Sequence, residues 1–532
     1  MRSTSTLLPR AGRPRSKEIK NRREQRKQRR HRGTALCRFS LFSVASCWSL
    51  VMMLSVSAGI EDKAKHLPDE APTGFNNSTN GFEGQDAFDK DRQKFEEIEA
   101  ISDGLGPVYN ATSCVSCHQN PVSGSSSQVA ELRAGRHEPD PDDPKKVIFI
   151  EPPGGSLIHQ RAIDAAIQEH VLPLDTVRTL RMSTNILGGG FVEVIPDSDI
   201  LKVRAAQPKG MRGLAVAVPV VVTGKQGAGG DFEFVFVERI GRFGWKCQEA
   251  SLVNFSAGAY LNEMGITNPL NPKENLSNGR DVSKFDQVPD PEDKVDPKDP
   301  DNQDHPFGDD VKSFTRFMRS TKAPPRDSSL AGASDVQQGE KLFRNNETLG
   351  CAICHQPDFT TPKAGTPIQA LYAGDKSSPG SDLGTVPQAL GDKIIHPYSD
   401  FMLHDIGTGD GIAQTQHAQR PARGSEKLQK ASLETLSREG VARVQARPRP
   451  GARRTLSDEP GLDQRTINTI RTAPLWGLRV RPQLLHDGSA LTIDEAIRRH
   501  RGQADEVTKK YLRLVADHPE QALQLIAFLN SL

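Results

Sequence analysis

Cys114-Val115-Ser116-Cys117-His118 is the stretch that decides what this chain is built around, and Cys351-Ala352-Ile353-Cys354-His355 repeats its pattern. Two cysteines two residues apart, followed directly by histidine, form the attachment signature of c-type haem: the thiols bond to the porphyrin vinyl groups and the histidine binds the iron. A zinc half-site or a thioredoxin-like dithiol would explain the cysteines, but not the histidine in both copies. The sequence therefore predicts two covalently bound c-type haems.

Length and composition suit a protein of more than one domain. The chain has 532 residues, of which 35% are hydrophobic, enough for two or three domains with real cores. Its net charge is +2, but the first 33 residues are densely basic. That basic patch would be lost if the N-terminal segment is removed. We therefore expect no nucleic-acid binding.

Residues 1–58 have the pattern of an export signal. A basic stretch ends near Arg32, an apolar run extends from Phe39 to Leu54, and the small residues Val56-Ser57-Ala58 follow. This order predicts a signal peptide cleaved near Ala58, with a retained membrane anchor as the alternative. Both place the mature chain in the periplasm or another exported location, where it touches a membrane only through an uncleaved anchor. Cys247 then has no partner, which predicts a lone buried thiol.

Changes in composition divide the remaining chain. Residues 59–92 predict a linker, 93–325 an N-terminal c-type haem domain, and 326–532 a C-terminal c-type haem domain. A basic insertion at about 416–454 in the last of these is more simply explained as a solvated loop than as a docking patch.

Periodicity gives the expected elements. Runs rich in Val and Phe at 214–223 and 232–237 predict strands of a small sheet inserted in the first haem domain. Helical patterns lie near 92–102, 311–319 and 492–499, and a helix at 339–343 leads to the second haem motif. We expect a mainly α fold: two c-type cytochrome domains with a small β insertion and long irregular loops.

Further stretches give the chain a family resemblance over about residues 93–532. They are Gly104-Leu105-Gly106-Pro107, Asn185-Ile186-Leu187-Gly188, Gly241-Arg242-Phe243-Gly244-Trp245, Glu263-Met264-Gly265, His404-Asp405-Ile406-Gly407, Arg471-Thr472-Ala473-Pro474 and Leu485-His486-Asp487-Gly488. Taken together, these stretches resemble the bacterial di-haem oxidoreductases, a peroxidase-like or thiol oxidoreductase-like group related to di-haem cytochrome c peroxidases.

The resemblance implies roles for three residues. Trp245 is similar to the tryptophan that carries electrons between the haems, although core packing explains it equally well. Glu263 is similar to the distal carboxylate that moves the peroxide proton. His500 matches the position that supplies the sixth ligand of the C-terminal haem; peroxidases usually have Met there, and His lowers the haem potential. Whether a calcium ion lies between the domains, as in related peroxidases, stays open.

The sixth ligand of the first haem is less defined. His137 is similar in position to the displaceable histidine of resting di-haem peroxidases, and His159 is a weaker candidate. The surroundings of His137 favour a mobile loop. We expect a loosely held or absent ligand, which would make the first haem the reactive one.

Three functions follow from these predictions. The first is an exported peroxidase-like enzyme in which the C-terminal haem passes electrons to a reactive N-terminal haem. The second is a non-catalytic di-haem electron-transfer protein, and the third is an oxidase of thiols or another organic substrate. The expected partners are a small redox protein or quinol-linked electron donor and a small-molecule oxidant or substrate.

Overall fold

The computed structural model describes residues 67–228, 230–373, 380–414, 442–443 and 464–532. The predictions for residues 1–58 and for nearly all of the basic insertion lie outside the described residues. Among the helices of the described part, none is both long and apolar enough to cross a bilayer.

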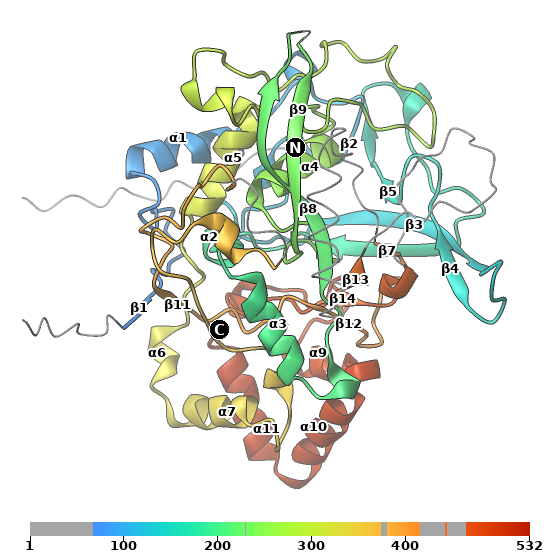
Figure 1. Cartoon of the computed structure of the whole chain (residues 1–532). Helices are drawn as coiled ribbons and strands as arrows, with labels where there is room; N and C mark the ends of the chain where they lie inside the picture. The colour runs from blue at the N-terminus through green and yellow to red at the C-terminus, as the bar shows by residue number, and fades with distance from the viewer. Residues whose placement is uncertain (1–66, 229, 374–379, 415–441, 444–463) are drawn as a thin grey trace, which may run out of the picture. The chain divides into compact units, whose positions relative to one another are not determined.

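The described residues are 32% helical with 18% in strands, so the prediction of a mainly α fold is wrong. Several small sheets lie among the helices (Figure 1). The structure does not show the two cytochrome domains that the sequence predicts. Residues Leu67–Leu532 form one compact unit, and the boundary at residue 325 stays a prediction.

A long hairpin confirms the two predicted strands. β8 (Val216–Gln226) pairs antiparallel with β9 (Phe232–Ile240), with an irregularity between Val221 and Thr223. Because successive side chains of a strand point to opposite faces, Val220 and Val222 pack in one apolar cluster while Val221 packs in another. The hairpin therefore contributes to two cores.

A second sheet was not predicted. β3 (Ala130–Pro139) pairs antiparallel with β4 (Val147–Ile150), β5 (Leu157–Ile158) and β7 (Val177–Met182), as Figure 1 shows. β3 alternates charged and small residues and has no apolar run, so it lacks the usual strand signal. This sheet is the main reason why the fold is not mainly α.

Helices surround each haem motif. Near the first lie α1 (Gln85–Glu96), α4 (Leu252–Met264) and α5 (Asp309–Ser320), which share an apolar cluster. Near the second lie α7 (Ser334–Arg344), α9 (Ile493–Arg499), α10 (Asp505–Asp517) and α11 (Pro519–Leu529), gathered at one end of this unit in Figure 1. The predicted helices at 311–319, 339–343 and 492–499 are thus confirmed, while the helix expected near 92–102 begins earlier, at Gln85.

The other strands and α-helices of the described residues lie outside these groups. They are β1 (Asp69–Glu70), β2 (Val108–Tyr109), β6 (Arg161–Ala162), β10 (Phe359–Thr360), β11 (Lys393–Ile395), β12 (Leu403–His404), β13 (Ala442–Arg443), β14 (Ile470–Arg471), α2 (Gly189–Glu193), α3 (Asp197–Ala206) and α6 (Ser328–Ala331).

Candidate functional site

Each Cys-x-x-Cys-His stretch forms a tight 3₁₀ turn. Cys114–Ser116 and Cys351–Ile353 are the turns, and the amide of the following histidine donates to the first cysteine's carbonyl at 3.0 Å in both. All four cysteines are free thiols. The turns therefore present two thiols and one imidazole each, as the attachment of haem requires.

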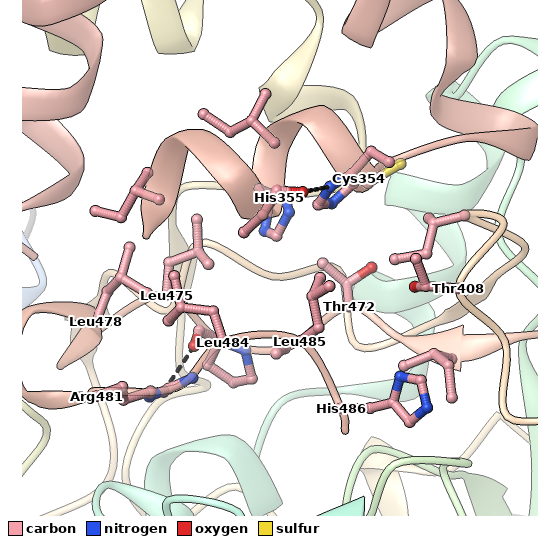
Figure 2. Close-up of a pocket in the computed structure, with 18 of the residues that line it drawn as sticks. Cys354, His355, Thr408, Thr472, Leu475, Leu478, Arg481, Leu484, Leu485 and His486 are labelled. Atoms are coloured by element: carbon pink, nitrogen blue, oxygen red, sulfur yellow. Dashed lines mark hydrogen bonds between the residues drawn. The ribbon is translucent and has the colours of Figure 1, made fainter. Parts of the chain in front are cut away.

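Each turn opens onto its own cavity. The first cavity is lined by Cys114, Cys117 and His118 together with residues of α4, β3 and α5. The second cavity is lined by Cys351, Cys354 and His355 together with residues of α9 and α11. In Figure 2, His355 faces leucine side chains across the second cavity, with Arg481 and His486 on the far side.

In the second cavity, two histidines each use Nδ1 in a hydrogen bond with a backbone carbonyl oxygen. His355 Nδ1 lies 3.0 Å from the carbonyl oxygen of Tyr398, and His500 Nδ1 lies 2.7 Å from that of Ala496. A neutral imidazole that donates through Nδ1 leaves Nε2 as its metal-binding atom. Burial lowers the pKa of His355 to about 4, with a further contribution from His500, and burial also lowers the pKa of His500. Both histidines therefore line one cavity in the neutral form that iron binds.

The first cavity differs from the second in the histidines that line it. Burial lowers the pKa of His118 to about 4, and His118 is the one histidine among the described residues that line this cavity. Its Nδ1 makes no hydrogen bond of normal geometry in the described part of the chain, although the backbone at Ser125 and Thr184 lies close enough to the ring to raise its pKa against the effect of burial. No second imidazole faces His118 from the described lining.

Carboxyl groups line the first cavity instead, and two of them, Glu131 and Glu263, interact with each other. Burial, and then the neighbouring Glu131, raise the pKa of Glu263 to about 8. Although burial opposes the charge, Arg133 keeps the pKa of Glu131 below its usual value through an ion pair with N–O 2.8 Å. Asn110 Nδ2 donates to Glu263 Oε2 at 3.0 Å. One carboxyl is therefore held charged and its neighbour protonated at neutral pH.

Trp245 lies where the two cavities approach each other. It lines both of them, as do Met182, Ser183 and Thr184. Its indole Nε1 donates to the Met182 carbonyl oxygen at 2.7 Å, and its ring centroid is 6.2 Å from that of His486. A hydrogen-bonded aromatic ring is thus fixed between the cavities.

Two arginines, the buried Arg471 and the half-buried Arg481, bear on whether the second cavity suits haem. Arg481 donates to the carbonyl oxygens of Pro474 and Trp476, and Arg471 donates to that of Gly244. Neither pairs with a carboxylate among the described residues, and burial lowers the pKa of both, that of Arg481 to about 10. Cations of this kind match the carboxylates of haem propionates. Together with the apolar wall and the two histidines, they make the second cavity fit the group.

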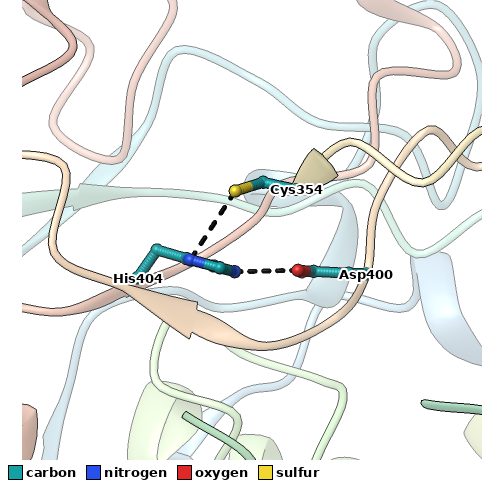
Figure 3. A group of neighbouring side chains, drawn as sticks. All are labelled: Cys354, Asp400 and His404. Carbon is teal, nitrogen blue, oxygen red and sulfur yellow. Dashed lines mark hydrogen bonds and ion pairs between the residues drawn. The ribbon is translucent and has the colours of Figure 1, made fainter. Parts of the chain in front are cut away.

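A buried Cys–His–Asp row adjoins the second cavity. Figure 3 shows the His404 ring between Cys354 and Asp400, with Nδ1–Sγ 3.6 Å and Nε2–Oδ2 2.8 Å. Although burial opposes the charge, Asp400 raises the pKa of His404. Cys354 belongs to the predicted haem-attachment motif, and His404 and Asp400 support the turn that carries it.

Two predicted ligand candidates lie apart from the first cavity. His137 in β3 contacts the Gly411 carbonyl oxygen through Nε2 at 2.7 Å and packs edge-on against Phe149. His159 is buried with Nδ1 at 2.9 Å from Glu169 and Nε2 at 3.0 Å from the Asn262 carbonyl oxygen. Neither histidine lines the first cavity. Cys247 is a free, buried thiol, as predicted.

Sequence reasoning missed three residues of these cavities. Glu131 and Glu249 line the first cavity, and His486 lines the second. Burial raises the pKa of Glu249 to about 8. His486 stood within a quoted motif without a role, whereas Glu131 and Glu249 lie in no motif. The Glu-x-Arg alternation at Glu131 and Arg133 was the only available signal, and it is weak.

Comparison with known proteins gives one informative match. A family model described as "Di-haem oxidoreductase, putative peroxidase" matches residues 157–427. This range contains Trp245, Glu263 and the second haem motif, but not the first motif or His500. No curated protein matches the chain. A solved structure of hydrazine synthase from Kuenenia stuttgartiensis, pressurised with xenon, is similar at 12% identity over 93% of this chain and 100% of that one, with a TM-score of 0.33. A similarity that low supports no argument.

Proposed function

Because the chain belongs to the di-haem oxidoreductase family, we propose that it is an exported c-type cytochrome that reduces peroxide at the first cavity. The second cavity receives the electrons from a small redox protein or a quinol-linked donor. The haems are attached covalently through Cys114 and Cys117 and through Cys351 and Cys354. Hydrogen peroxide, two electrons and two protons give two waters.

The contact between Glu131 and Glu263 is the observation that carries this proposal. The two carboxyls line the first cavity together with His118 and share one proton at neutral pH. A carboxyl whose pKa is near the working pH can both accept and return a proton. An electron carrier with six-coordinate iron has no use for such a pair.

The residues divide the work of the first cavity. When haem is bound there, its iron supplies the electrons and the site at which peroxide binds. Glu263 gives the proton that it holds at neutral pH to the departing oxygen, and the Glu131–Glu263 pair then takes up the proton that peroxide loses. Asn110 orients the Glu263 carboxyl through its 3.0 Å hydrogen bond. Arg133 keeps Glu131 charged, which holds the shared proton on Glu263 until it is needed.

The second cavity suits electron entry. His355 and His500, which line this cavity, would both hold the iron of a haem bound there, and this would leave no ligand position for substrate. Trp245 then provides an aromatic step between the cavities. Placement in the periplasm supplies the compartment in which c-type haem and exported donors meet.

Peroxide turnover by the purified di-haem protein tests this function. We expect Glu263→Gln to lower kcat about 10²- to 10⁴-fold, the usual contribution of a general acid–base group, with unchanged haem spectra. Glu138→Gln is the matched control, because Glu138 lies on the same strand as Glu131 but is exposed and paired with Arg136.

Two other outcomes would favour a different function. Two low-spin haems that ignore cyanide in every redox state would make the protein an electron carrier. Turnover of a thiol or another organic substrate that exceeds that of peroxide, and that survives Glu263→Gln, would make it an oxidase.

A further inference from the structure

A buried carboxylate in the loop after β12 joins two buried cations. Asp410 is 5% exposed, and its Oδ2 lies 2.9 Å from Arg181 Nε and 2.8 Å from Arg181 Nη2. Its Oδ1 lies 2.7 Å from Lys246 Nζ. Arg181 and Lys246 are both buried. In the part of the chain that the structure describes, Asp410 is the one carboxylate that pairs with both of them.

These ion pairs close a ring that contains Trp245. Arg181 and Met182 are neighbours at the end of β7, and Trp245 and Lys246 are neighbours in the loop after β9. The Trp245 indole donates to the Met182 carbonyl oxygen at 2.7 Å. The two segments are therefore joined once by this hydrogen bond and once through Asp410. Two separate attachments hold the indole in one orientation, whereas a single hydrogen bond would let the loop pivot.

Lys246 ties the ring to a third segment. Its ammonium group donates to the carbonyl oxygens of Thr466 and Thr469, each at 2.7 Å. Although burial opposes the charge, Arg181 and then Lys246 lower the pKa of Asp410 to about 2. Because Asp410 stays charged at every pH at which the enzyme would work, the ring keeps its ion pairs throughout.

Asp410 is also linked to the lining of both cavities. Arg181 lines the first cavity, where its Nη1 lies 3.9 Å from Glu131 Oε1 and its charge helps to keep the pKa of Glu131 low. His486 lines the second cavity; burial lowers its pKa, and the charge of Asp410 opposes that effect. Asp410 itself belongs to the described lining of neither cavity.

We propose that Asp410 is a positioning residue that holds Trp245 between the two cavities and shares the charge of Arg181 with Glu131. The inference rests on the proposed function, because it takes from there the roles of Trp245 and of Glu131 with Glu263, named here the carboxyl pair. Desolvation of three buried charges offsets most of their attraction, so stability is a weak reason for this arrangement. A fixed geometry between the cavities is a stronger one.

The effect of Asp410 on the carboxyl pair has a definite direction. The other ionisable groups that line the first cavity around the pair are Cys114, Cys117, His118, Arg133, Arg181, Glu249 and Tyr260. Without the charge of Asp410, Arg181 would act on the pair alone, and a nearby cation favours the ionised form of a carboxyl group. We therefore expect the pair to lose its shared proton at lower pH in Asp410→Asn and at higher pH in Arg181→Gln.

Two measurements on the full-length, haem-loaded protein test the proposal without peroxide. Infrared titration of the protonated carboxyl band follows the carboxyl pair, whose component is the one missing from Glu263→Gln. Rapid-reaction spectroscopy of the half-reduced protein follows electron exchange between the haems. Asp410→Asn should move the titration down on the order of one pH unit and slow the exchange at least as much as Trp245→Phe does. Arg181→Gln should move the titration in the opposite direction.

Asp197→Asn is the matched control. Asp197 is likewise a buried carboxylate that pairs with two buried cations, Arg239 and Arg242, and it belongs to the described lining of neither cavity. Both substitutions leave buried cations without their partner and should lower Tm. Only Asp410→Asn should also change the titration and the exchange, which separates a positioning role from a structural one.

Lys246→Met decides the question if Asp410→Asn does not fold. This variant keeps the Asp410–Arg181 pair but opens the ring, so it should slow the exchange and move the titration less. The proposal is overturned if folded Asp410→Asn, or Lys246→Met in its place, exchanges electrons as the wild type does. It is overturned equally if Asp197→Asn changes the titration and the exchange as much. Absence of peroxide turnover in the wild type would instead refute the proposed function, because neither measurement uses peroxide.

Discussion

The first and second cavities begin from the same five-residue pattern and end with opposite chemistry. Four histidines line the second cavity, among them His355 and His500, against a wall of leucine and isoleucine. In the described lining of the first, His118 is joined by acids, amides and Arg133. In the function proposed above, each motif would hold one side of a haem, and the element packed over the other side would decide whether the iron is closed off or left reactive. Here α9 covers one cavity, while α4 and β3 cover the other.

The proximal histidines differ in the same direction. His355 Nδ1 lies 3.0 Å from the Tyr398 carbonyl oxygen, while His118 Nδ1 makes no hydrogen bond of that geometry among the described residues and the ring has only weaker contacts with the backbone of Ser125 and Thr184. A hydrogen bond to that nitrogen makes an imidazole a more basic ligand, which favours oxidised iron. We therefore expect the second haem to have the lower potential and to deliver electrons to the first.

Removal of His500 should make the second haem accessible to small ligands, as we expect the first haem to be. We expect His500→Ala to convert the second haem from low-spin to high-spin and to let it bind cyanide, because the variant leaves the iron with one protein ligand. Electronic and EPR spectra measure this change. The surface variant His518→Ala should keep the wild-type spectrum. A low-spin second haem in His500→Ala would show that another histidine, such as His486, is the ligand.

The shared proton of the first cavity should appear in the pH dependence of turnover. The pKa of Glu263 is raised to about 8, so this carboxyl keeps its proton below that pH and loses it above. We expect kcat to fall about tenfold per pH unit above 8. Glu131→Gln removes a neighbouring negative charge, lowers the pKa of Glu263 and should move this limb to lower pH, whereas Glu138→Gln should not. An unmoved limb in Glu131→Gln would disprove the coupling.

Substitution of Trp245, the residue that lines both cavities, should have the smallest effect of the three changes. Trp245→Phe keeps an aromatic ring but loses the hydrogen bond to Met182, which should lower the free energy of unfolding by about 0.5–1.5 kcal/mol and slow electron exchange between the haems. Rapid-reaction spectroscopy of the half-reduced protein measures that rate. Trp476→Phe, in a core cluster and in the described lining of neither cavity, is the control. Equal rates in both variants would reduce Trp245 to a packing residue.

Local patterns were read correctly where the deciding residues are neighbours in sequence. The β8–β9 hairpin follows from its Val- and Phe-rich runs, and α5 and α9 follow from their periodicity. β3 was missed because its alternation of charged and small residues looks like a loop until β7 and β5 pair with it. His137 was placed by its distance from His118 along the chain, yet β3 carries it away from the first cavity to Gly411.

The sequence by itself determined the two Cys-x-x-Cys-His turns and the histidine that each presents, because each turn is made of consecutive residues. Only the tertiary structure decided what faces those histidines. Glu131 comes from β3 and Glu263 from the end of α4, and neither residue signals the other in the sequence. Their shared proton exists because packing brings two carboxyls together away from water, and burial and repulsion between like charges are properties of the folded chain alone.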